Sequence, residues 1–174
     1  MQSIQTVSEN TIYVGASDRR LAKFENLFPI PRGVSYNAYV ILDEKTALLD
    51  TADASVGAQF LENVAAALDG RKLDYLIVDH MEPDHAAMIE AVLVRWPDLR
   101  LVVNAKTLPM LKMYFPTDSA AIDDALVVKE GDTLDLGKHK LTFVMAPMVH
   151  WPEVMMTFDT TTGTLFSADA FGTF

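Results

Sequence analysis

The feature that most constrains this chain is a six-residue segment in which four side chains belong to metal-ligand types. The segment reads His80-Met81-Glu82-Pro83-Asp84-His85. It follows an apolar run over 73–78 and precedes a helical pattern, so it forms the junction between a strand and a helix. Proteins with α/β folds tend to place their chemistry at the carboxyl ends of strands. The segment therefore predicts the beginning of a site for two metal ions.

A proline fixes the geometry of this segment. Pro83 disfavours the α conformation at Glu82 and is itself favoured in the first turn of a helix. We therefore predict an extended backbone before Pro83, in which the period of two places His80 and Glu82 on the same side. A helix is predicted over about 84–96. His85 extends the apolar stripe of that helix by one turn and is expected to point inward.

Two later residues occupy equivalent positions in the pattern. His150 follows the apolar run 141–149, and Asp169 follows the run 164–168. Both are predicted to lie just past a strand end, where the ligand types of the first segment also lie. Together these six residues supply three imidazoles and three carboxylates.

Each of these residues also has a purely structural interpretation when it is taken alone. Asp84 can be a helix N-cap, and His85 can be a hydrogen-bonded core histidine. His150 can be the buried neighbour of Trp151, and Asp169 can be an ordinary turn residue. The joint pattern favours the metal site, because four fixed types at these spacings arise by chance in roughly one chain in ten thousand.

Strand and helix signals alternate along the chain and indicate one α/β domain without a linker. Strands are predicted at 11–14, 34–42, 47–49, 73–78, 101–103, 126–128, 133–136, 141–145, 154–158 and 164–167. Helices are predicted around 60–68, 84–96 and 108–114. The layout indicates sheets with helices packed outside them. His139, in the turn at 137–139, is predicted to lie on the surface.

Composition and charge exclude several classes of function. A chain of 174 residues that is 50% hydrophobic suits one domain with a substantial core. The net charge of −10 argues against nucleic acid and anionic membranes as partners. Because the chain has no cysteine, a metal would bind to histidine nitrogens and carboxylate oxygens. The chain shows neither a signal peptide nor an apolar stretch of roughly 20 residues, so a cytoplasmic protein is expected.

The segment resembles the metal-binding signature of the metallo-β-lactamase fold, an αββα sandwich. Zinc hydrolases of that fold have a histidine where this chain has Glu82. The pattern His-x-Glu-x-Asp-His, followed by a distant histidine and then an aspartate, resembles the flavodiiron proteins, or A-type flavoproteins. The resemblance covers essentially the whole chain and implies that residues 1–174 are the N-terminal part of a lactamase-like domain.

The resemblance also implies what a complete family member would add. The family has one further histidine ligand and a flavodoxin-like domain that holds FMN, and neither is found in residues 1–174. We therefore expect an incomplete sandwich and a chain that is either a fragment or one half of a split protein.

The ligand roles come from the same resemblance. One iron would be bound by His80, Glu82 and His150, the second iron would be bound by Asp84 and His85, and Asp169 would bridge the two. No catalytic residue is implied beyond these metal ligands. Asp50 would support the site without binding metal, and Trp151 would pack beside it.

The implied activity is the reduction of dioxygen to water, of nitric oxide to nitrous oxide, or of both. Electrons would come from FMN, which a rubredoxin or a flavin reductase would reduce, in a homodimer or in a complex with the missing half. A carboxylate at Glu82 in place of an imidazole shifts the metal preference from zinc toward iron or manganese. Two alternatives stay open: a zinc hydrolase acting through a metal-bound hydroxide, and a non-catalytic scaffold that retains the ligand residues.

Overall fold

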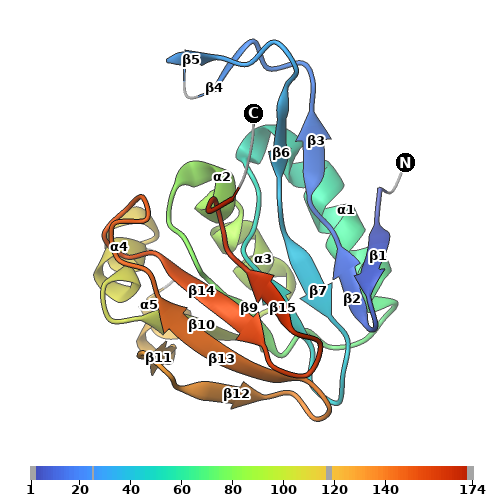
Figure 1. Cartoon of the computed structure of the whole chain (residues 1–174), viewed down its shortest axis with the longest axis vertical. Helices are drawn as coiled ribbons and strands as arrows, with labels where there is room; N and C mark the ends of the chain where they lie inside the picture. The colour runs from blue at the N-terminus through green and yellow to red at the C-terminus, as the bar shows by residue number, and fades with distance from the viewer. Residues whose placement is uncertain (1–2, 25, 117–118, 172–174) are drawn as a thin grey trace.

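The computed structural model describes residues 3–24, 26–116 and 119–171, which form two stacked sheets with helices against one of them (Figure 1). The larger sheet contains, in spatial order, β1 (Gln5–Ser8), β2 (Thr11–Tyr13), β7 (Tyr39–Ile41), β8 (Ala47–Leu49), β9 (Tyr75–Ile77), β10 (Arg100–Asn104) and β11 (Leu126–Val128). Strands β8 to β11 are parallel, whereas β1, β2, β7 and β8 pair antiparallel. The second sheet is antiparallel and contains β12 (Thr133–Asp135), β13 (Lys140–Met145), β14 (Met155–Asp159) and β15 (Thr164–Phe166).

Shorter elements complete the described structure. Two small antiparallel pairs join β3 (Ala16–Asp18) to β6 (Val34–Tyr36) and β4 (Lys23–Phe24) to β5 (Phe28–Pro29). The helices are η1 (Ala54–Val56), α1 (Gly57–Leu68), α2 (Pro83–Ala86), α3 (Ile89–Arg95), α4 (Thr107–Tyr114) and α5 (Ser119–Asp123). Among the described residues, none of these helices combines the length and the apolar character that crossing a membrane would require.

Two apolar cores separate the three layers. The first lies between the helices and the large sheet, and it includes Phe60 of α1 and Leu101 of β10. The second lies between the two sheets, where Ile77 of β9 faces Phe143 and Met155. The described elements thus stack as helix, sheet and sheet, which are three of the four layers of the predicted αββα sandwich.

Burial patterns explain why some strands appear in the sequence as continuous apolar runs and others as alternating apolar and polar residues. The parallel strand β10 is covered on both faces, and four of its five residues are buried, which is why it appears as a continuous apolar run. In β13, buried Leu141 and Phe143 alternate with less buried neighbours, because one face of this sheet packs on the core. Val144 and Leu165, both at least one-third exposed, lie in this second sheet.

The strand predicted over 34–42 is two strands. β6 ends at Tyr36 and pairs with β3, whereas β7 begins at Tyr39 and joins the large sheet. The carbonyl of Ala38, between them, accepts a hydrogen bond from the backbone N–H of Val14. Both strands contribute to the core, so the apolar pattern continues through the break. The elements β1, β3, β4, β5, η1 and α5 were also not predicted.

The helix predicted over about 84–96 is interrupted. It consists of α2 and α3, which are separated at Ala87 and Met88. The carbonyl of His85 accepts hydrogen bonds from the backbone N–H of Thr51 at 2.8 Å and from its Oγ1 at 2.5 Å. A buried threonine from the loop after β8 thus occupies a carbonyl that a continuous helix would use internally. This interruption lies directly beside the candidate site.

The prediction that His139 lies on the surface is wrong. His139 is 1% exposed, and Nδ1 of its ring lies 2.8 Å from Oδ2 of Asp159. A carboxylate can only accept, so Nδ1 carries the hydrogen. The backbone N–H of His139 also donates to Asp43. Partners 20 and 96 residues away in the sequence therefore fold this turn inward.

Candidate metal centre

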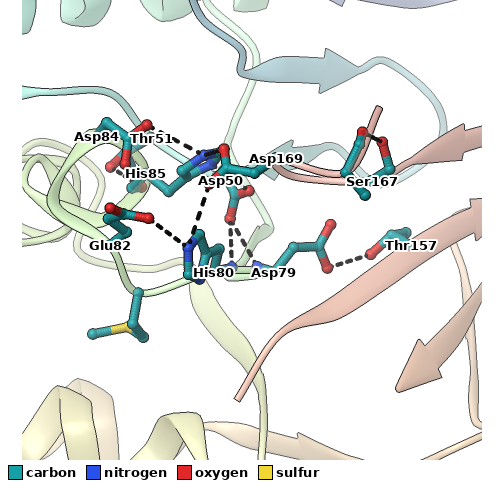
Figure 2. Close-up of polar contacts among 12 residues, drawn as sticks. Asp50, Thr51, Asp79, His80, Glu82, Asp84, His85, Thr157, Ser167 and Asp169 are labelled. Atoms are coloured by element: carbon teal, nitrogen blue, oxygen red, sulfur yellow. Dashed lines mark hydrogen bonds and ion pairs between the residues drawn. The ribbon is translucent and has the colours of Figure 1, made fainter. Parts of the chain in front are cut away.

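Four loops meet at one end of the stacked sheets and bring the predicted ligand residues together. Figure 2 shows most of them: His80, Glu82, Asp84, His85 and Asp169. The loop after β9 carries His80 to His85, the loop between β13 and β14 carries His150, and the segment after β15 carries Asp169. The loop after β8 adds Asp50, which lies beside them. Each loop leaves the carboxyl end of a strand, as the sequence pattern predicts.

The local geometry of the first segment follows from its proline. Glu82 is extended, with φ −60° and ψ 145°, and Pro83 is the first residue of α2. Glu82 therefore holds the N-cap position, and the interpretation of Asp84 as the N-cap is wrong. Asp84 lies in the first turn and is buried with His85.

One group of ligand-type atoms surrounds Nε2 of His80. This atom lies 3.1 Å from Oε2 of Glu82 and 3.3 Å from Nε2 of His150. Oε2 of Glu82 is also 2.8 Å from Nε2 of His150. Oδ2 of Asp169 completes the group, at 3.6 Å from His80 and 3.0 Å from His150. One donor atom from each of these four residues lies within 4.8 Å of the others.

A second group surrounds Nε2 of His85. This atom lies 2.7 Å from Oδ1 of Asp169 and 3.6 Å from Oδ2 of Asp84. These three residues also offer donor atoms within 4.8 Å of one another. Asp169 thus belongs to both groups, with one oxygen toward each, and all six predicted residues are brought together.

The chemistry of the converging atoms fits a cation better than internal hydrogen bonding. Nε2 of His80 and Nε2 of His150 face each other, and two neutral ring nitrogens need a proton or a cation between them to attract. Oδ1 of Asp84 is buried and has no hydrogen-bond partner among the described residues. An unpaired buried carboxylate oxygen costs free energy unless an ion or a proton compensates it.

The pKa values of two carboxyl groups of the site, those of Asp84 and Asp169, are shifted in opposite directions. Burial raises the pKa of Asp84 to about 6, and the charges of Asp169 and Glu82 add to this effect. Burial would also raise the pKa of Asp169, but hydrogen bonds and charge from His85 outweigh it and lower that pKa to about 2. The pKa of His85 is raised well above its usual value, because the carboxylates of Asp169 and Asp50 outweigh its burial. Strong perturbations of this kind are typical of functional sites.

A layer of buried carboxylates supports the histidines. Oδ2 of Asp50 lies 3.0 Å from Nδ1 of His85, and its Oδ1 accepts from the backbone N–H of Asp79. Burial and the charge of Asp50 raise the pKa of Asp79, whose Oδ1 accepts a hydrogen bond from Thr157. The contacts of Asp50 are those of the supporting residue that the resemblance implies.

Glu153 is a supporting residue that the sequence pattern did not predict. Its Oε1 lies 2.7 Å from Nδ1 of His80, and the side chains of both residues are fully buried. The only signal in the sequence is one acidic residue in the otherwise apolar stretch that follows His150. The ring of Trp151 packs edge-on against that of His80, with centroids 5.4 Å apart, as predicted.

The loops of the site contain residues in the left-handed backbone conformation, which also occurs elsewhere in the chain, as at Asn10 and Asp69. Asp50, Met148 and Ala168 all have positive φ angles, of 54°, 68° and 47°. Non-glycine residues seldom adopt this conformation, and it persists where the surrounding structure over-determines it. A pocket of about 530 Å³ opens beside these loops. Its lining includes four of the predicted ligands together with apolar residues such as Phe24 and Ile30 and the polar residues Ser35 and Asn37.

Comparisons with known proteins agree with this geometry. Residues 34–174 match the family described as ODP family beta lactamase. The chain is 36% identical over 168 residues to a nitric oxide reductase from Moorella thermoacetica, and the match covers 95% of this chain and 41% of that protein. The chain spans less than half the length of the curated relatives it matches.

Solved structures show the same fold. The flavodiiron protein from Giardia intestinalis superimposes with a TM-score of 0.91 and 28% identity, over 99% of this chain and 41% of that chain. The rubredoxin oxygen:oxidoreductase from Desulfovibrio gigas gives a TM-score of 0.87 and 31% identity, over 94% of this chain and 40% of that chain. The predicted metallo-β-lactamase-like fold is thereby confirmed, and the chain belongs to the ODP family of β-lactamase-like domains, as a flavodiiron-type member.

Proposed function

We propose that this chain holds a non-haem diiron centre. The ligands would be His80, Glu82 and His150 for one iron, Asp84 and His85 for the other, and Asp169 for both. The observation that carries the proposal is the division of the donor atoms into two groups that share Asp169. The two oxygens of one carboxylate can each take one cation, and those of Asp169 already face different histidines.

The donor set favours iron over zinc. Across both groups it contains three imidazoles and three carboxylates and no sulfur. Glu82 adds a hard, negatively charged oxygen where the zinc hydrolases of this fold have an imidazole, and such oxygens favour iron or manganese. Zinc has a filled d shell and cannot donate electrons, whereas a pair of irons would supply electrons and two adjacent positions for small molecules.

The rest of the pocket suits a small uncharged substrate. Apart from Ser35 and Asn37, the remaining lining residues, such as Phe24, Ile30 and Val34, offer no hydrogen-bonding side chain. The chain's own contribution would be to fix the histidines with buried carboxylates and to limit the water around the ligand atoms. Dioxygen and nitric oxide are small and nearly apolar, so they match such a wall.

We propose that the whole protein reduces dioxygen to water, nitric oxide to nitrous oxide, or both. The names of two similar proteins support this choice, since one is a nitric oxide reductase and the other a rubredoxin oxygen:oxidoreductase. Both reactions consume electrons and protons, which FMN on a domain or chain outside residues 1–174 would deliver. Residues 1–174 would then be the N-terminal part of a lactamase-like domain, acting in the cytoplasm.

The partners of the whole protein are part of the same proposal. A rubredoxin or a flavin reductase would reduce the FMN, and the diiron domain would work in a homodimer or in a complex with the chain that supplies the flavin. The rubredoxin in the name of the Desulfovibrio gigas structure supports the first of these donors.

Metal analysis after anaerobic loading tests the proposal. The chain should retain two irons after gel filtration, and Mössbauer spectra should show an interacting pair. Two tightly held zincs together with esterase or lactonase activity would overturn it in favour of the hydrolase. Failure to retain any metal would overturn it in favour of the non-catalytic scaffold.

A further inference from the structure

We propose that Glu153 is a positioning residue of the metal centre, which holds His80 so that its Nε2 faces the metal. This inference rests on the proposed diiron function and deepens it. Glu153 lies in the loop between β13 and β14, three residues after His150. It is not one of the six candidate ligands, and its side chain lies behind the ring of His80.

One carboxylate oxygen of Glu153 controls both the ring and the backbone of the ligand segment. Oε1 lies 2.7 Å from Nδ1 of His80 and accepts the backbone N–H of Met81 at 3.0 Å. The side chains of His80 and Glu153 are both 0% exposed, so water does not compete for these bonds. The first residues of the ligand segment are therefore tied to the loop that also carries His150.

The contact selects one form of the imidazole. Carboxylate oxygens can only accept, and one faces each ring nitrogen of His80. Oε1 of Glu153 is the nearer, 2.7 Å from Nδ1 against 3.1 Å from Nε2 to Oε2 of Glu82, so the single hydrogen of the neutral ring is assigned to Nδ1. In the neutral ring, Nε2 is then left with a free lone pair. Nε2 is also the atom that faces Glu82 and His150. Metal-binding histidines commonly have such an outer partner, which fixes the tautomer and the ring plane and increases ligand basicity.

Glu153 is itself anchored on its backbone side. Its carbonyl accepts a hydrogen bond of 2.6 Å from Nδ2 of Asn104, at the end of β10. Oδ1 of Asn104 in turn accepts the backbone N–H groups of Lys106 and Thr107. The loop that holds His80 is thus fixed to the large sheet, which gives the carboxylate a defined position rather than a mobile one.

The second oxygen of Glu153 indicates that charge matters as well as geometry. Oε2 is buried and has no hydrogen-bond partner among the described residues. Packing alone would be served by an uncharged side chain at lower cost, because a buried carboxylate with an unpaired oxygen is penalised. A cation on the far side of the His80 ring would compensate that penalty. Asp50 holds the same place behind His85, so each histidine of the first segment has its own carboxylate.

The primary test is Glu153→Gln in the full chain, with ferrous iron as the probe. The amide oxygen can still accept from His80 and Met81, and Oε2 loses no hydrogen bond, so the change removes mainly the charge. We expect iron affinity, measured anaerobically against a competing chelator, to fall by about 10-fold, within the range known for outer partners. The matched control is Asp159→Asn, which neutralises the carboxylate of the buried His139 pair at the far end of β14. This control should leave iron affinity unchanged.

A second readout does not depend on metal. In the metal-free chain at alkaline pH, ¹⁵N-correlated NMR should show the Nδ1–H tautomer of His80, assigned by loss of its signals in His80→Gln. Glu153→Leu removes the acceptor and should shift the ring toward the Nε2–H form that free imidazole side chains favour. Glu153→Gln should keep the original tautomer, and Glu153→Asp should recover part of the iron affinity.

The outcomes separate this inference from the proposed function. Iron affinity in Glu153→Gln equal to that of the unaltered chain would overturn the positioning role while the diiron centre stands. An Nε2–H tautomer of His80 in the unaltered chain would overturn it as well. If the unaltered chain binds no iron, the diiron proposal fails, whereas the tautomer measurement still decides whether Glu153 orients His80.

Discussion

Two buried histidine–carboxylate pairs lie at opposite ends of β14, and they differ in what the second ring nitrogen meets. His80 and Glu153 are 2.7 Å apart at one end, and His139 and Asp159 are 2.8 Å apart at the other. Burial is nearly identical in the two pairs. Nε2 of His80 faces further ligand atoms, whereas His139 belongs to no group of three metal-binding side chains among the described residues.

The comparison teaches that a buried histidine on a carboxylate is not a metal site in itself. At residues 137–140 such a pair stabilises a turn that folds inward. At the candidate metal centre such a pair orients a histidine toward other ligand-type side chains. Asp159 also accepts from Thr161 and Thr162, so its charge is spread over the turn. Glu153 keeps one oxygen unpaired instead. The substitutions below should separate the two roles.

The largest effect is expected at Asp169, the residue shared by both ligand groups. Asp169→Ala removes an oxygen from each group at once, so binding of both irons should weaken by more than the roughly 10- to 100-fold typical of outer partners. Metal content after gel filtration checks this. Because Asp169 also pairs with buried His85, urea unfolding of the metal-free variant is measured alongside metal content to show that the variant is folded. Retention of two irons in the variant would contradict the bridging role.

At the His139–Asp159 end of β14 we expect a loss of stability without a loss of iron binding. His139→Ala leaves Asp159 without its ring partner in a fully buried position, and breaking a buried pair costs about 3 kcal/mol. Urea unfolding of the metal-free chain measures this loss. Iron stoichiometry in the folded fraction should stay that of the unaltered chain. A variant that unfolds normally but loses iron would mean that the two ends of the sheet are not independent.

The contrast also shows which parts of the molecule could be predicted from the sequence. The ligand segment was accessible because proline geometry and strand period act over neighbouring residues, so the placement of Glu82 and Pro83 followed directly. His150 and Asp169 were accessible because strand ends are visible as the ends of apolar runs. The fold class followed from the same runs together with the family resemblance.

The parts that were missed depend on partners far apart in the chain. Glu153 meets His80 across 73 residues, and the burial of His139 depends on Asp43, 96 residues away. The break between α2 and α3 is caused by Thr51, which is 34 residues from the carbonyl it binds. Local periodicity carries no information about such contacts, because the tertiary fold creates them.

A smaller effect is expected from exchanging one proposed ligand at the candidate metal centre. Glu82→His restores the imidazole of the zinc hydrolases and removes one negative charge beside His80. The preference for zinc over ferrous iron should rise by roughly tenfold, or about 1.4 kcal/mol, because nitrogen donors suit zinc better than hard oxygens do. Competition dialysis with both metals measures the ratio. Asp159→Asn should not change it, and an unchanged ratio in Glu82→His would count against the role given to this carboxylate.

The smallest effect is a pH dependence at the structural end. Burial would raise the pKa of Asp159, but hydrogen bonds from Thr162 and His139 outweigh it and hold the pKa below its usual value. The unfolded chain therefore takes up this proton at higher pH than the folded chain does, so the stabilisation is present above the usual aspartate pKa and is lost as the pH falls below it.

The difference in unfolding free energy between the unaltered chain and Asp159→Asn should be largest near neutral pH and should shrink below about pH 4. The carboxylates of the candidate metal centre titrate in the unaltered chain and in Asp159→Asn alike, so their contribution to the pH dependence cancels in this difference. A difference that stays constant down to acid pH would show that Asp159 acts through its shape and hydrogen bonds and not through its charge.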